Sequence, residues 1–331
     1  MKRALVIGSG SIAKRHIRNL KALAPSAEII CVSSSGRKIS VAEVGPVSIV
    51  NDLNEAILSG PDLAIIASPS SHHLCHARKC LDAAIPVLIE KPLCSDFQEL
   101  DDFDLCQEGR KIGIAYNLRF LPAALFVKEF IESDRIGRIH TVFCQVGQYL
   151  PDWRPGTNYK ESVSAQKALG GGALLELSHE LDYLNWFFGN FDCASAVLRN
   201  SGALGIDVEE NVDAILTSKL GIVCHLHLDF LQRPASRTFK AMGENGLIQW
   251  DLIENQVTLT DQRGNSSVVF SDSDYDRNDM YVDQLGAFVS FCNGDGQFHS
   301  GLESATEVMQ LIAAIRQADD TGNRVCVGGT I

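Results

Sequence analysis

A short stretch near the start of the chain, Ala4-Leu5-Val6-Ile7-Gly8-Ser9-Gly10-Ser11-Ile12-Ala13, decides the fold. Its first four residues are apolar and predict a buried strand. The apolar spacing that continues through Ile17 and Leu20 predicts a helix directly afterwards. The glycines therefore lie in a turn between a strand and a helix.

This turn has the spacing of a dinucleotide-binding loop. In such loops the first glycine permits a tight turn, the second lets the backbone approach a pyrophosphate, and a third small residue lets the helix pack close to the strand. Gly8, Gly10 and Ala13 fill these three positions. We therefore expect the N–H groups of Ser11 and Ile12, at the helix N-terminus, to meet the pyrophosphate. An ordinary glycine turn is the alternative.

Strands and helices alternate along the first third of the chain. Near-continuous apolar strands that alternate with helices predict a parallel sheet covered on both faces, as in a Rossmann domain. The expected strands are residues 4–7, 28–32, 47–50, 63–67 and 87–89, and a further helix is expected near 97–107.

The pattern changes after about residue 120, where polar intervals between strands become longer. These later strands predict a mostly antiparallel sheet, with helices near residues 123–133, 281–292 and 304–318. We therefore expect an α/β protein with a dinucleotide-binding domain over residues 1–120. A substrate-binding and oligomerisation domain is expected over residues 121–331.

Composition and charge restrict the class of protein. With 331 residues, 45% of them apolar, the chain can form two ordinary cores and does not resemble a disordered protein. Its formal net charge is −12 and its Lys and Arg residues form no cluster, which argues against a nucleic acid or an anionic membrane as partner. No stretch approaches the roughly 20 apolar residues of a membrane span.

The ten cysteines are scattered and show no paired zinc spacing. We interpret them as small core residues of a cytoplasmic protein in a reducing environment, and we expect no metal site. The alternative is a metal site in one short segment, formed by His72, His73, Cys75, His76 and Cys80.

The residues after the second strand indicate which cofactor binds. An acidic residue there accepts hydrogen bonds from the adenosine ribose 2′-hydroxyl of NAD. This chain instead has Ser33, Ser34 and then Arg37, which suit a 2′-phosphate better. The sequence therefore favours NADP over NAD, and a solvated surface loop is the alternative.

A lysine follows the fifth strand, in the sequence Glu90-Lys91-Pro92. Pro92 disfavours a helical backbone at Lys91, and the strand end directs the lysine into the ligand crevice of a parallel sheet. A lysine there can hydrogen-bond or protonate a substrate oxygen during hydride transfer. The alternative is an ordinary surface lysine.

A second chemically informative segment covers residues 170–186. Its leucines recur at helical spacing, and Glu176, His179 and Tyr183 fall on the opposite face, with Asp182 beside them. A carboxylate close to a histidine can fix its tautomer and raise its pKa, as proton transfer requires. The alternative is a solvated helix face with a chance histidine.

Together these segments resemble the glucose–fructose oxidoreductase / inositol dehydrogenase (Gfo/Idh/MocA) family over essentially the whole chain. The resemblance rests on five segments in order, which are residues 8–13, 67–73, 90–92, 116–122 and 170–182. It implies a Rossmann domain followed by an α/β domain whose open sheet commonly mediates dimers or tetramers. It also implies hydride transfer between NAD(P) and a secondary alcohol carbon of a sugar or cyclitol.

The resemblance also implies roles for individual residues. Lys91 matches the lysine that contacts the substrate next to the nicotinamide, and His179 matches the proposed acid/base. The other residues expected at the site are Ser68, Pro69, His73, Glu90 and Asn117 around the cofactor, and Arg119 and Tyr183 around the substrate.

This chain departs from the family pattern near His179. Many members have an aspartate four residues earlier, where this chain has Leu175, and Glu176 lies three residues earlier instead. Both Glu176 and Asp182 remain candidates as the partner of His179. The expected substrate is a sugar, nucleotide sugar or cyclitol. The alternatives are a non-catalytic dinucleotide-binding regulator and a redox-neutral enzyme that retains its NAD.

Polar residues of the second domain form one more candidate surface. His225, His227 and Asp229 alternate along one strand and so share a face, and Arg233 follows shortly. Arg233 is expected to bind sugar hydroxyls or the phosphate of a nucleotide sugar if this face meets the substrate. A polar outer face, or one between subunits, is the alternative.

Overall fold

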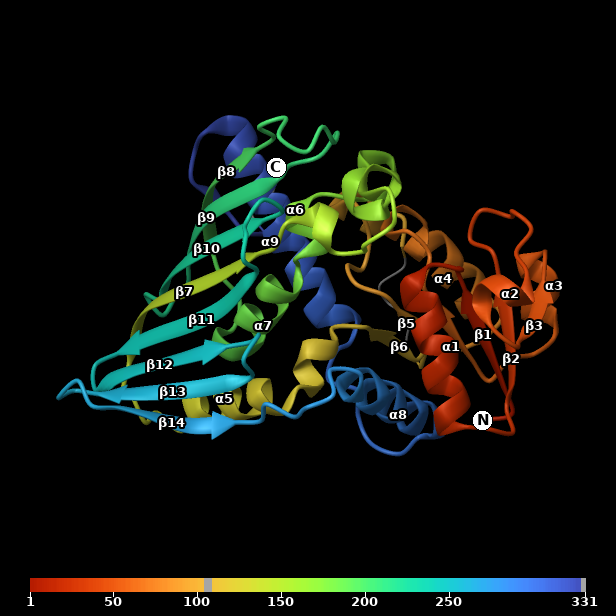
Figure 1. Cartoon of the computed structure of the whole chain (residues 1–331), viewed down its shortest axis with the longest axis horizontal. Helices are drawn as coiled ribbons and strands as arrows, with labels where there is room; N and C mark the ends of the chain where they lie inside the picture. The colour runs from red at the N-terminus through yellow and green to blue at the C-terminus, as the bar shows by residue number, and fades with distance from the viewer. Residues whose placement is uncertain (104–108, 329–331) are drawn as a thin grey trace. The chain divides into compact units, whose positions relative to one another are not determined.

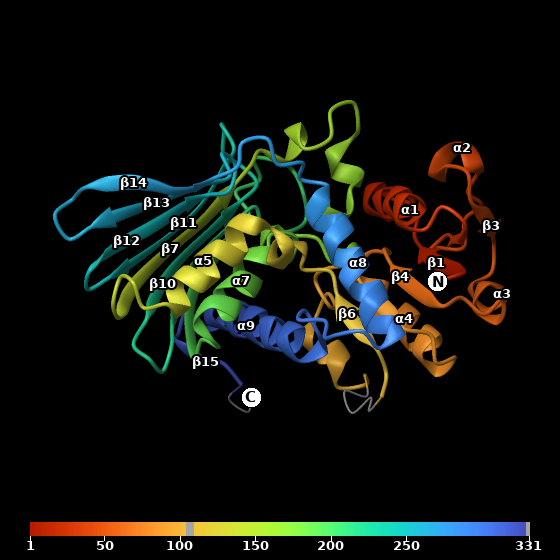
Figure 2. The same ribbon diagram turned by 90° about the horizontal axis from the view of Figure 1, so that it is seen from below.

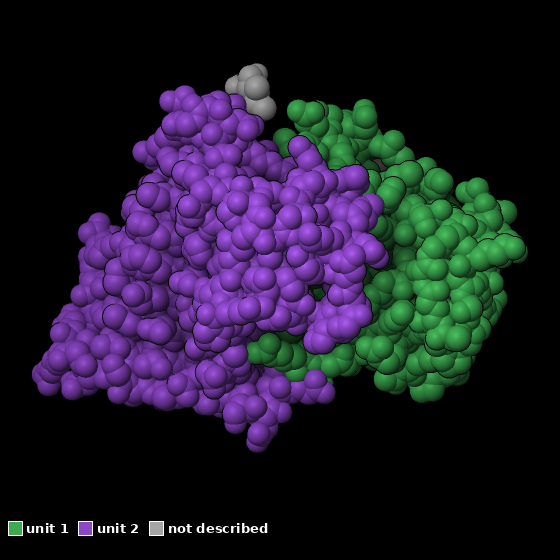
Figure 3. Space-filling view, turned by 45° about the horizontal axis from the view of Figure 1, so that its top comes forward, with its two compact units in different colours: residues 1–117, 277–306 green, residues 118–276, 307–331 purple. Residues whose placement is uncertain are grey.

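The computed structural model describes residues 1–103 and 109–328. The chain forms two compact units (Figure 3). The first comprises residues 1–117 and 277–306, and the second comprises residues 118–276 and 307–331. Residues 277–306 therefore belong to the first unit together with the amino-terminal segment. None of the helices in the described ranges has the length and apolar character needed to cross a membrane.

The first unit is built on a six-stranded parallel sheet, which confirms the expected Rossmann architecture (Figure 1). Its strands, in spatial order, are β3 (Ser48–Val50), β2 (Glu28–Val32), β1 (Arg3–Ile7), β4 (Leu63–Ile66), β5 (Val87–Ile89) and β6 (Ile112–Ile114). The strand order reverses direction at β1. The connection from β1 to β2 and the connection from β4 to β5 therefore run in opposite directions along the sheet. Because both are right-handed crossovers, their helices α1 (Ser11–Leu23) and α4 (His73–Asp82) lie on opposite faces.

Smaller elements complete the β–α connections of this unit. They are α2 (Val41–Val44), α3 (Leu53–Leu58) and η1 (Ser70–His72). At the site of the helix expected over residues 97–107, the structure has a single 3₁₀ turn, η2 (Phe97–Leu100). Asp96 and Glu99 form a capping box at its start. Residues 104–107 of that expected helix lie outside the described residues.

Helix α8 (Asp279–Asn293) packs on α1 in the first unit. The Arg15 guanidinium lies over the Tyr281 ring, 4.3 Å from its centroid. The Ile114 N–H donates to the Ser300 carbonyl at 2.7 Å, next to the last strand of the sheet. Gly113 has no side chain in the space that the Phe288 and Phe298 rings occupy. These contacts explain why residues 277–306 group with the amino-terminal segment.

The second unit contains a nine-stranded, mostly antiparallel sheet, as expected. Only β7 and β10 among its described neighbours pair in parallel. In spatial order its strands are β14 (Ser266–Ser271), β13 (Gln256–Asp261), β12 (Gly246–Asp251), β11 (Ser236–Gly243), β7 (Ile139–Gly147), β10 (Val223–Asp229), β9 (Asn211–Thr217), β8 (Cys193–Arg199) and β15 (Val325–Cys326).

Helices cover one face of this sheet, and its other face is open (Figure 2). The helices are α5 (Pro122–Glu132), α6 (Ala173–Glu176), α7 (His179–Phe188) and α9 (Leu302–Thr321). The core between these helices and the sheet is aromatic. Tyr183, Phe239 and Trp250 are fully buried there, and the Tyr183 ring packs against the rings of the other two. Short 3₁₀ turns lie in the connections, namely η3 (Asn117–Phe120), η4 (Leu150–Asp152), η5 (Tyr159–Glu161), η6 (Val163–Ala165) and η7 (Lys167–Leu169).

Candidate functional site

The candidate residues of the first unit lie at one edge of the parallel sheet, which we call the cofactor edge. The carboxyl ends of parallel strands meet at the same edge, which is where such sheets bind their ligands. The residues that follow β1, β2, β4, β5 and β6 there are Gly8, Ser33, Ser68 with Pro69, Glu90 with Lys91, and Asn117. Residues expected at the cofactor from separate motifs therefore share this edge.

The turn after β1 fits a dinucleotide pyrophosphate. Gly8 has φ of +130°, and a Cβ there would lie 2.8 Å from the Ala67 carbonyl carbon, so only glycine is accommodated. Gly10 is the N-cap residue of α1, and no side chain caps this helix. The space beside Gly10 is open, since no described atom lies within 4 Å of the position that a Cβ would take. The N–H groups of Ser11 and Ile12 are therefore placed as donors to a phosphate.

Arg37 lies close to this turn. Its guanidinium donates to Ser9 Oγ at 2.9 Å and forms an ion pair with Glu43. The hydrogen bond from Arg37 lowers the pKa of Glu43, so the carboxylate stays charged and offsets part of the arginine's charge. Ser33 is buried and faces Ser35, with their Oγ atoms 3.4 Å apart. The segment after β2 thus offers hydroxyl groups and two adjacent cations, Arg37 and Lys38, but Arg37 already has an anionic partner.

A buried contact between His16 and Glu90 links α1, the helix after the glycine turn, to the segment after β5 that carries Lys91. His16 Nε2 lies 2.6 Å from Glu90 Oε1, and the imidazole is fully buried. Glu90 Oε2 in turn accepts the backbone N–H of Lys91 at 3.3 Å. His16 was not among the residues predicted from the sequence. Its signal was a histidine within the apolar stripe of α1, one helical turn after Ala13.

His73 fixes the loop after β4 against the segment after β5. Its Nδ1 lies 2.8 Å from the Pro92 carbonyl oxygen, and its Nε2 lies 2.9 Å from the Ser68 carbonyl oxygen. Burial lowers the pKa of His73 and favours the neutral ring. A neutral ring donates to one carbonyl at a time. His73 therefore hydrogen-bonds one of these two segments at a time and packs against the other.

The second unit does not contain one continuous helix through the segment 170–186, where the leucines recur at helical spacing. Helix α6 ends at Glu176 and α7 begins at His179, so two residues interrupt the helical spacing. Glu176 and His179 are both half-buried and flank this break. The expected polar face is wrong for Tyr183, which is fully buried with its hydroxyl 3.0 Å from Cys144 Sγ. Helix α7 is buried on nearly every side, with all residues from Glu180 to Asn185 buried, so Tyr183 lies in the aromatic core although it is opposite the leucine stripe.

Asp182 and Arg119 form a buried ion pair with each other. Arg119 Nε and Nη2 donate to the two Asp182 oxygens at 2.9 and 2.7 Å, and both side chains are almost completely buried. Burial raises the pKa of Asp182, and the Arg119 guanidinium opposes this shift. The bidentate geometry anchors the first turn of α7, and therefore the backbone next to His179, to the segment before α5.

A second ion pair, in which only the carboxylate is fully buried and which was not predicted from the sequence, also holds α7. Arg237 on β11 donates to both Glu180 oxygens at 2.7 and 3.0 Å, and Glu180 is fully buried. Glu180 directly follows His179, so the two ion pairs bracket the first turn of the helix. This arrangement limits the positions that the His179 backbone can adopt.

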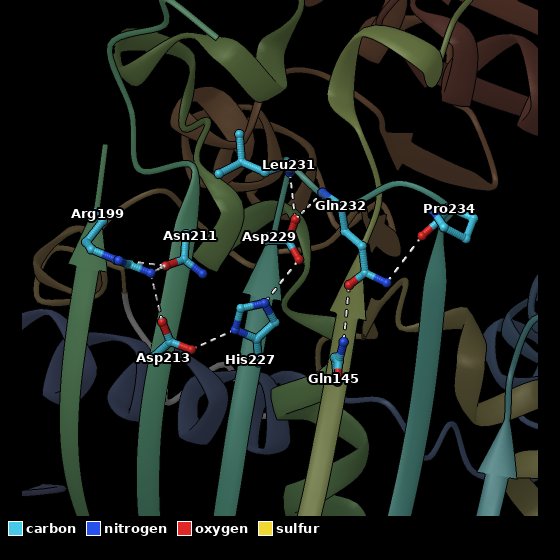
Figure 4. A network of polar contacts seen from close by, with 9 residues as sticks. All are labelled: Gln145, Arg199, Asn211, Asp213, His227, Asp229, Leu231, Gln232 and Pro234. Carbon is cyan, nitrogen blue, oxygen red and sulfur yellow. Dashed lines mark hydrogen bonds and ion pairs between the residues drawn. The ribbon is translucent and has the colours of Figure 1, made fainter. Parts of the chain in front are cut away.

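Polar residues at the end of β10 form a network on the open face of the sheet (Figure 4). His227 Nδ1 lies 2.6 Å from Asp213 Oδ1, and His227 Nε2 lies 3.1 Å from Asp229 Oδ2. The hydrogen bonds with Asp229 and Asp213 raise the pKa of His227 to about 9. Asp229 Oδ1 also accepts the N–H groups of Leu231 and Gln232, both at 2.6 Å. The network thus fixes the start of the loop between β10 and β11.

Arg233 extends from that loop. Its guanidinium pairs with Asp152, with Nε 3.0 Å from Oδ2, and lies over the Tyr149 ring, 3.5 Å from the centroid. More than half of the side chain is exposed. Arg233 is thus accessible and held in one orientation within the second unit.

Comparisons with known proteins agree with this arrangement. Residues 2–113 match the oxidoreductase family with an NAD-binding Rossmann fold, and residues 125–249 match the GFO/IDH/MocA C-terminal domain. The class defined by fold and site is therefore that of oxidoreductases with a Rossmann domain. Because the two matches cover most of the chain, it belongs to the Gfo/Idh/MocA oxidoreductase family.

Individual relatives are distant. Levoglucosan dehydrogenase from Pseudarthrobacter phenanthrenivorans is 32% identical over 43% of this chain and 37% of its own length. The putative oxidoreductase YteT from Bacillus subtilis is 27% identical over 40% of this chain, which spans only 31% of that relative. D-glucoside 3-dehydrogenase from Escherichia coli is 22% identical and is matched over 98% of this chain and 97% of its own.

Solved structures share the fold over the full length. Levoglucosan dehydrogenase in complex with NADH and levoglucosan has a TM-score of 0.86 at 19% identity, covering 99% of this chain and 100% of that one. The WlbA dehydrogenase from Bordetella pertussis, in complex with NADH and UDP-GlcNAcA, has a TM-score of 0.82 at 21% identity, with 100% of both chains covered.

Proposed function

We propose that this protein is an NAD(P)-dependent oxidoreductase that transfers a hydride to or from a secondary alcohol carbon of a sugar, nucleotide sugar or cyclitol. The observation that carries the proposal is the cofactor edge of the parallel sheet. At this edge the glycine turn, which fits a pyrophosphate, follows β1, and Lys91 follows β5 of the same sheet. Relatives that act on levoglucosan, inositol and glucosides support the substrate class.

The nicotinamide, when bound, accepts or donates the hydride. Lys91 is proposed to hydrogen-bond the substrate oxygen and stabilise the charge that develops on it. Glu90, held by His16, is proposed to orient the Lys91 backbone. Ser68, Pro69, His73 and Asn117 are proposed to shape the cofactor edge.

His179, in the second unit, is proposed as the acid/base that moves the hydroxyl proton. Glu176, at the end of α6, is its proposed partner, because both Asp182 oxygens accept hydrogen bonds from Arg119. Asp182 and Arg119 are proposed to position α7 rather than to contact the substrate. Arg233, exposed and oriented by Asp152, is the proposed contact for a polar or phosphorylated part of the substrate.

NADP is the proposed preferred cofactor. Arg37 and the hydroxyl groups after β2 support this preference, because no acidic residue stands at the end of that strand to repel a 2′-phosphate. The pairing of Arg37 with Glu43 weakens the preference, so NAD is expected to be used as well.

We also propose a homodimer or homotetramer assembled through the open face of the nine-stranded sheet. Phe143, Val197 and Ile215 are 40%, 53% and 47% exposed there, and they border a hollow of about 430 Å³. Exposed apolar side chains gathered on one face are typical of subunit contacts.

The nine described cysteines are all thiols, which supports a cytoplasmic location.

The test of the proposed activity is nicotinamide absorbance during turnover, with NAD and NADP, against a panel of sugars, nucleotide sugars and cyclitols. Lys91→Met should abolish turnover and leave cofactor affinity nearly unchanged. The matched control is Lys79→Met, which removes an exposed lysine from α4 of the same unit. Full activity in Lys91→Met would overturn the assignment.

A further inference from the structure

Two cysteines face each other at the edge of the nine-stranded sheet. Cys193 begins β8 and Cys326 ends β15, and the two residues are direct partners in the antiparallel ladder. Their sulfur atoms are 3.6 Å apart, although 133 positions separate them in the sequence. Cys326 is exposed and Cys193 is half-buried, in contrast to the buried cysteines of the cores.

The ladder places this pair where a disulfide fits. The Val327 N–H donates to the Asp192 carbonyl at 2.7 Å, so the bond flanks the Cys193–Cys326 pair and leaves it as a non-hydrogen-bonded pair. Such pairs have Cα atoms about 4.5 Å apart. A disulfide accepts Cα separations of about 4.4–6.8 Å. The sulfurs can therefore bond through side-chain rotation and a small movement of a two-residue edge strand.

We propose that Cys193 and Cys326 form a reversible disulfide that fastens the carboxyl-terminal strand to β8 under oxidising conditions. The oxidant is a low-molecular-weight disulfide such as oxidised glutathione. The Cys326 thiolate attacks one sulfur of that disulfide, forms a mixed disulfide and releases one small thiol. The Cys193 thiolate then attacks Cys326 Sγ, forms the intramolecular bond and releases the second small thiol. The two cysteines lose two electrons, and the small disulfide gains them.

The surroundings of Cys326 set the pH dependence of this reaction. The hydrogen bond with Cys193 raises the pKa of Cys326, and the nearby Asp192 acts in the same direction, whereas Arg324 opposes it. Few thiolates are therefore present at neutral pH. Because the thiolate is the attacking species, the rate of disulfide formation should increase as the pH rises above neutrality.

The disulfide would act on the carboxyl-terminal segment. The described contacts of β15 with the sheet are its pairing with Ala194 and Cys193, the Val327–Asp192 bond and a hydrogen bond from Arg324 to Thr217 at 2.6 Å. A covalent bond across so long a loop restricts the unfolded chain strongly. Cys193 also shares a strand face with Ser195 and Val197, which border the hollow on the open face.

The experiment treats the full-length protein with oxidised glutathione or with dithiothreitol, followed by alkylation, intact mass measurement and peptide mapping. We expect loss of two hydrogen atoms, a cross-linked peptide containing Cys193 and Cys326, and a thermal midpoint raised by roughly 5–15 °C. Cys193→Ser and Cys326→Ser should each remove both the cross-link and the rise. Cys75→Ser, at another exposed cysteine, should change neither.

Two results would overturn the assignment of the disulfide itself. One is complete alkylation of Cys193 and Cys326 after exposure to the oxidant at pH 9. The other is a mapped cross-link that joins either residue to a different cysteine, including Cys326 of a second copy of the chain. Reduction by dithiothreitol must restore the original midpoint, and failure to do so would refute reversibility.

Discussion

Replacing His16 with alanine should destabilise the first unit and also slow catalysis. The imidazole is fully buried, and its Nε2 lies 2.6 Å from Glu90 Oε1. Without it, Glu90 Oε1 loses its hydrogen-bond partner, in a carboxylate that is only 10% exposed. Leaving a buried charged group without its partner costs about 3 kcal/mol. At roughly 2–4 °C for each kcal/mol, the melting temperature of this unit should fall by about 6–12 °C.

The catalytic effect follows from the second oxygen of the same carboxylate. Glu90 Oε2 accepts the backbone N–H of Lys91, so a Glu90 side chain that moves also releases the lysine segment. Misplacing a catalytic group by about 1 Å can cost roughly a hundredfold in rate. We therefore expect His16→Ala to lower kcat by about tenfold or more in steady-state assays, with a smaller change in the KM for the cofactor.

A matched control distinguishes this effect from general instability. Asn19 is also buried on α1, but it exchanges hydrogen bonds with Asn278 at 3.3 and 3.0 Å and does not contact Glu90. Asn19→Ala should lower the melting temperature, measured by circular dichroism, and leave kcat unchanged. A double-mutant cycle of His16→Ala with Glu90→Ala should give a coupling free energy of about 1 kcal/mol or more. Additive effects, or an equal loss of kcat in Asn19→Ala, would refute the proposed link.

Three further results are expected. Gly8→Ala should abolish dinucleotide binding in calorimetry, because its Cβ would overlap the Ala67 carbonyl group; retained affinity would contradict the assigned turn. Arg37→Ala should reduce kcat/KM for NADP by about tenfold and leave that for NAD unchanged, whereas Glu43→Gln should raise the NADP preference. The raised pKa of His227, about 9 against 6.5, stabilises the fold below pH 6.5, and this stabilisation is lost as the pH rises through 9. His227→Gln should remove that loss, which is about 1 kcal/mol for a partly solvated group, in urea unfolding at pH 6.5 and 9.5.

Local sequence patterns predicted the sheets and the glycine turn. The strand before Gly8 and the helix after Gly10 are specified by residues within a few positions of each other, and the turn geometry requires glycine at Gly8 itself. The apolar runs of the parallel strands and the alternating pattern of the later strands likewise reflect which faces are buried.

These local patterns do not predict contacts between residues that are far apart in the sequence. The His16–Glu90 pair spans 74 positions and the Arg237–Glu180 pair spans 57. The break between α6 and α7 also had no local signal, because leucines continue at helical spacing across Leu177. The same spacing predicts a polar face for Tyr183, whereas its ring packs against Phe239 and Trp250 in the core because α7 is buried on nearly every side. Tertiary packing, which propensity does not encode, decided each of these features.

The most direct test of the proposed hydride transfer uses turnover in D₂O with an unlabelled substrate and NADP or NAD. Direct transfer from the substrate carbon predicts a reduced nicotinamide without deuterium at C4, and deuterium at C4 when the substrate carbinol carbon carries the label. Solvent deuterium at C4 would contradict direct transfer. Substrate conversion without net reduced cofactor, on a dinucleotide that does not exchange, would instead establish redox-neutral chemistry.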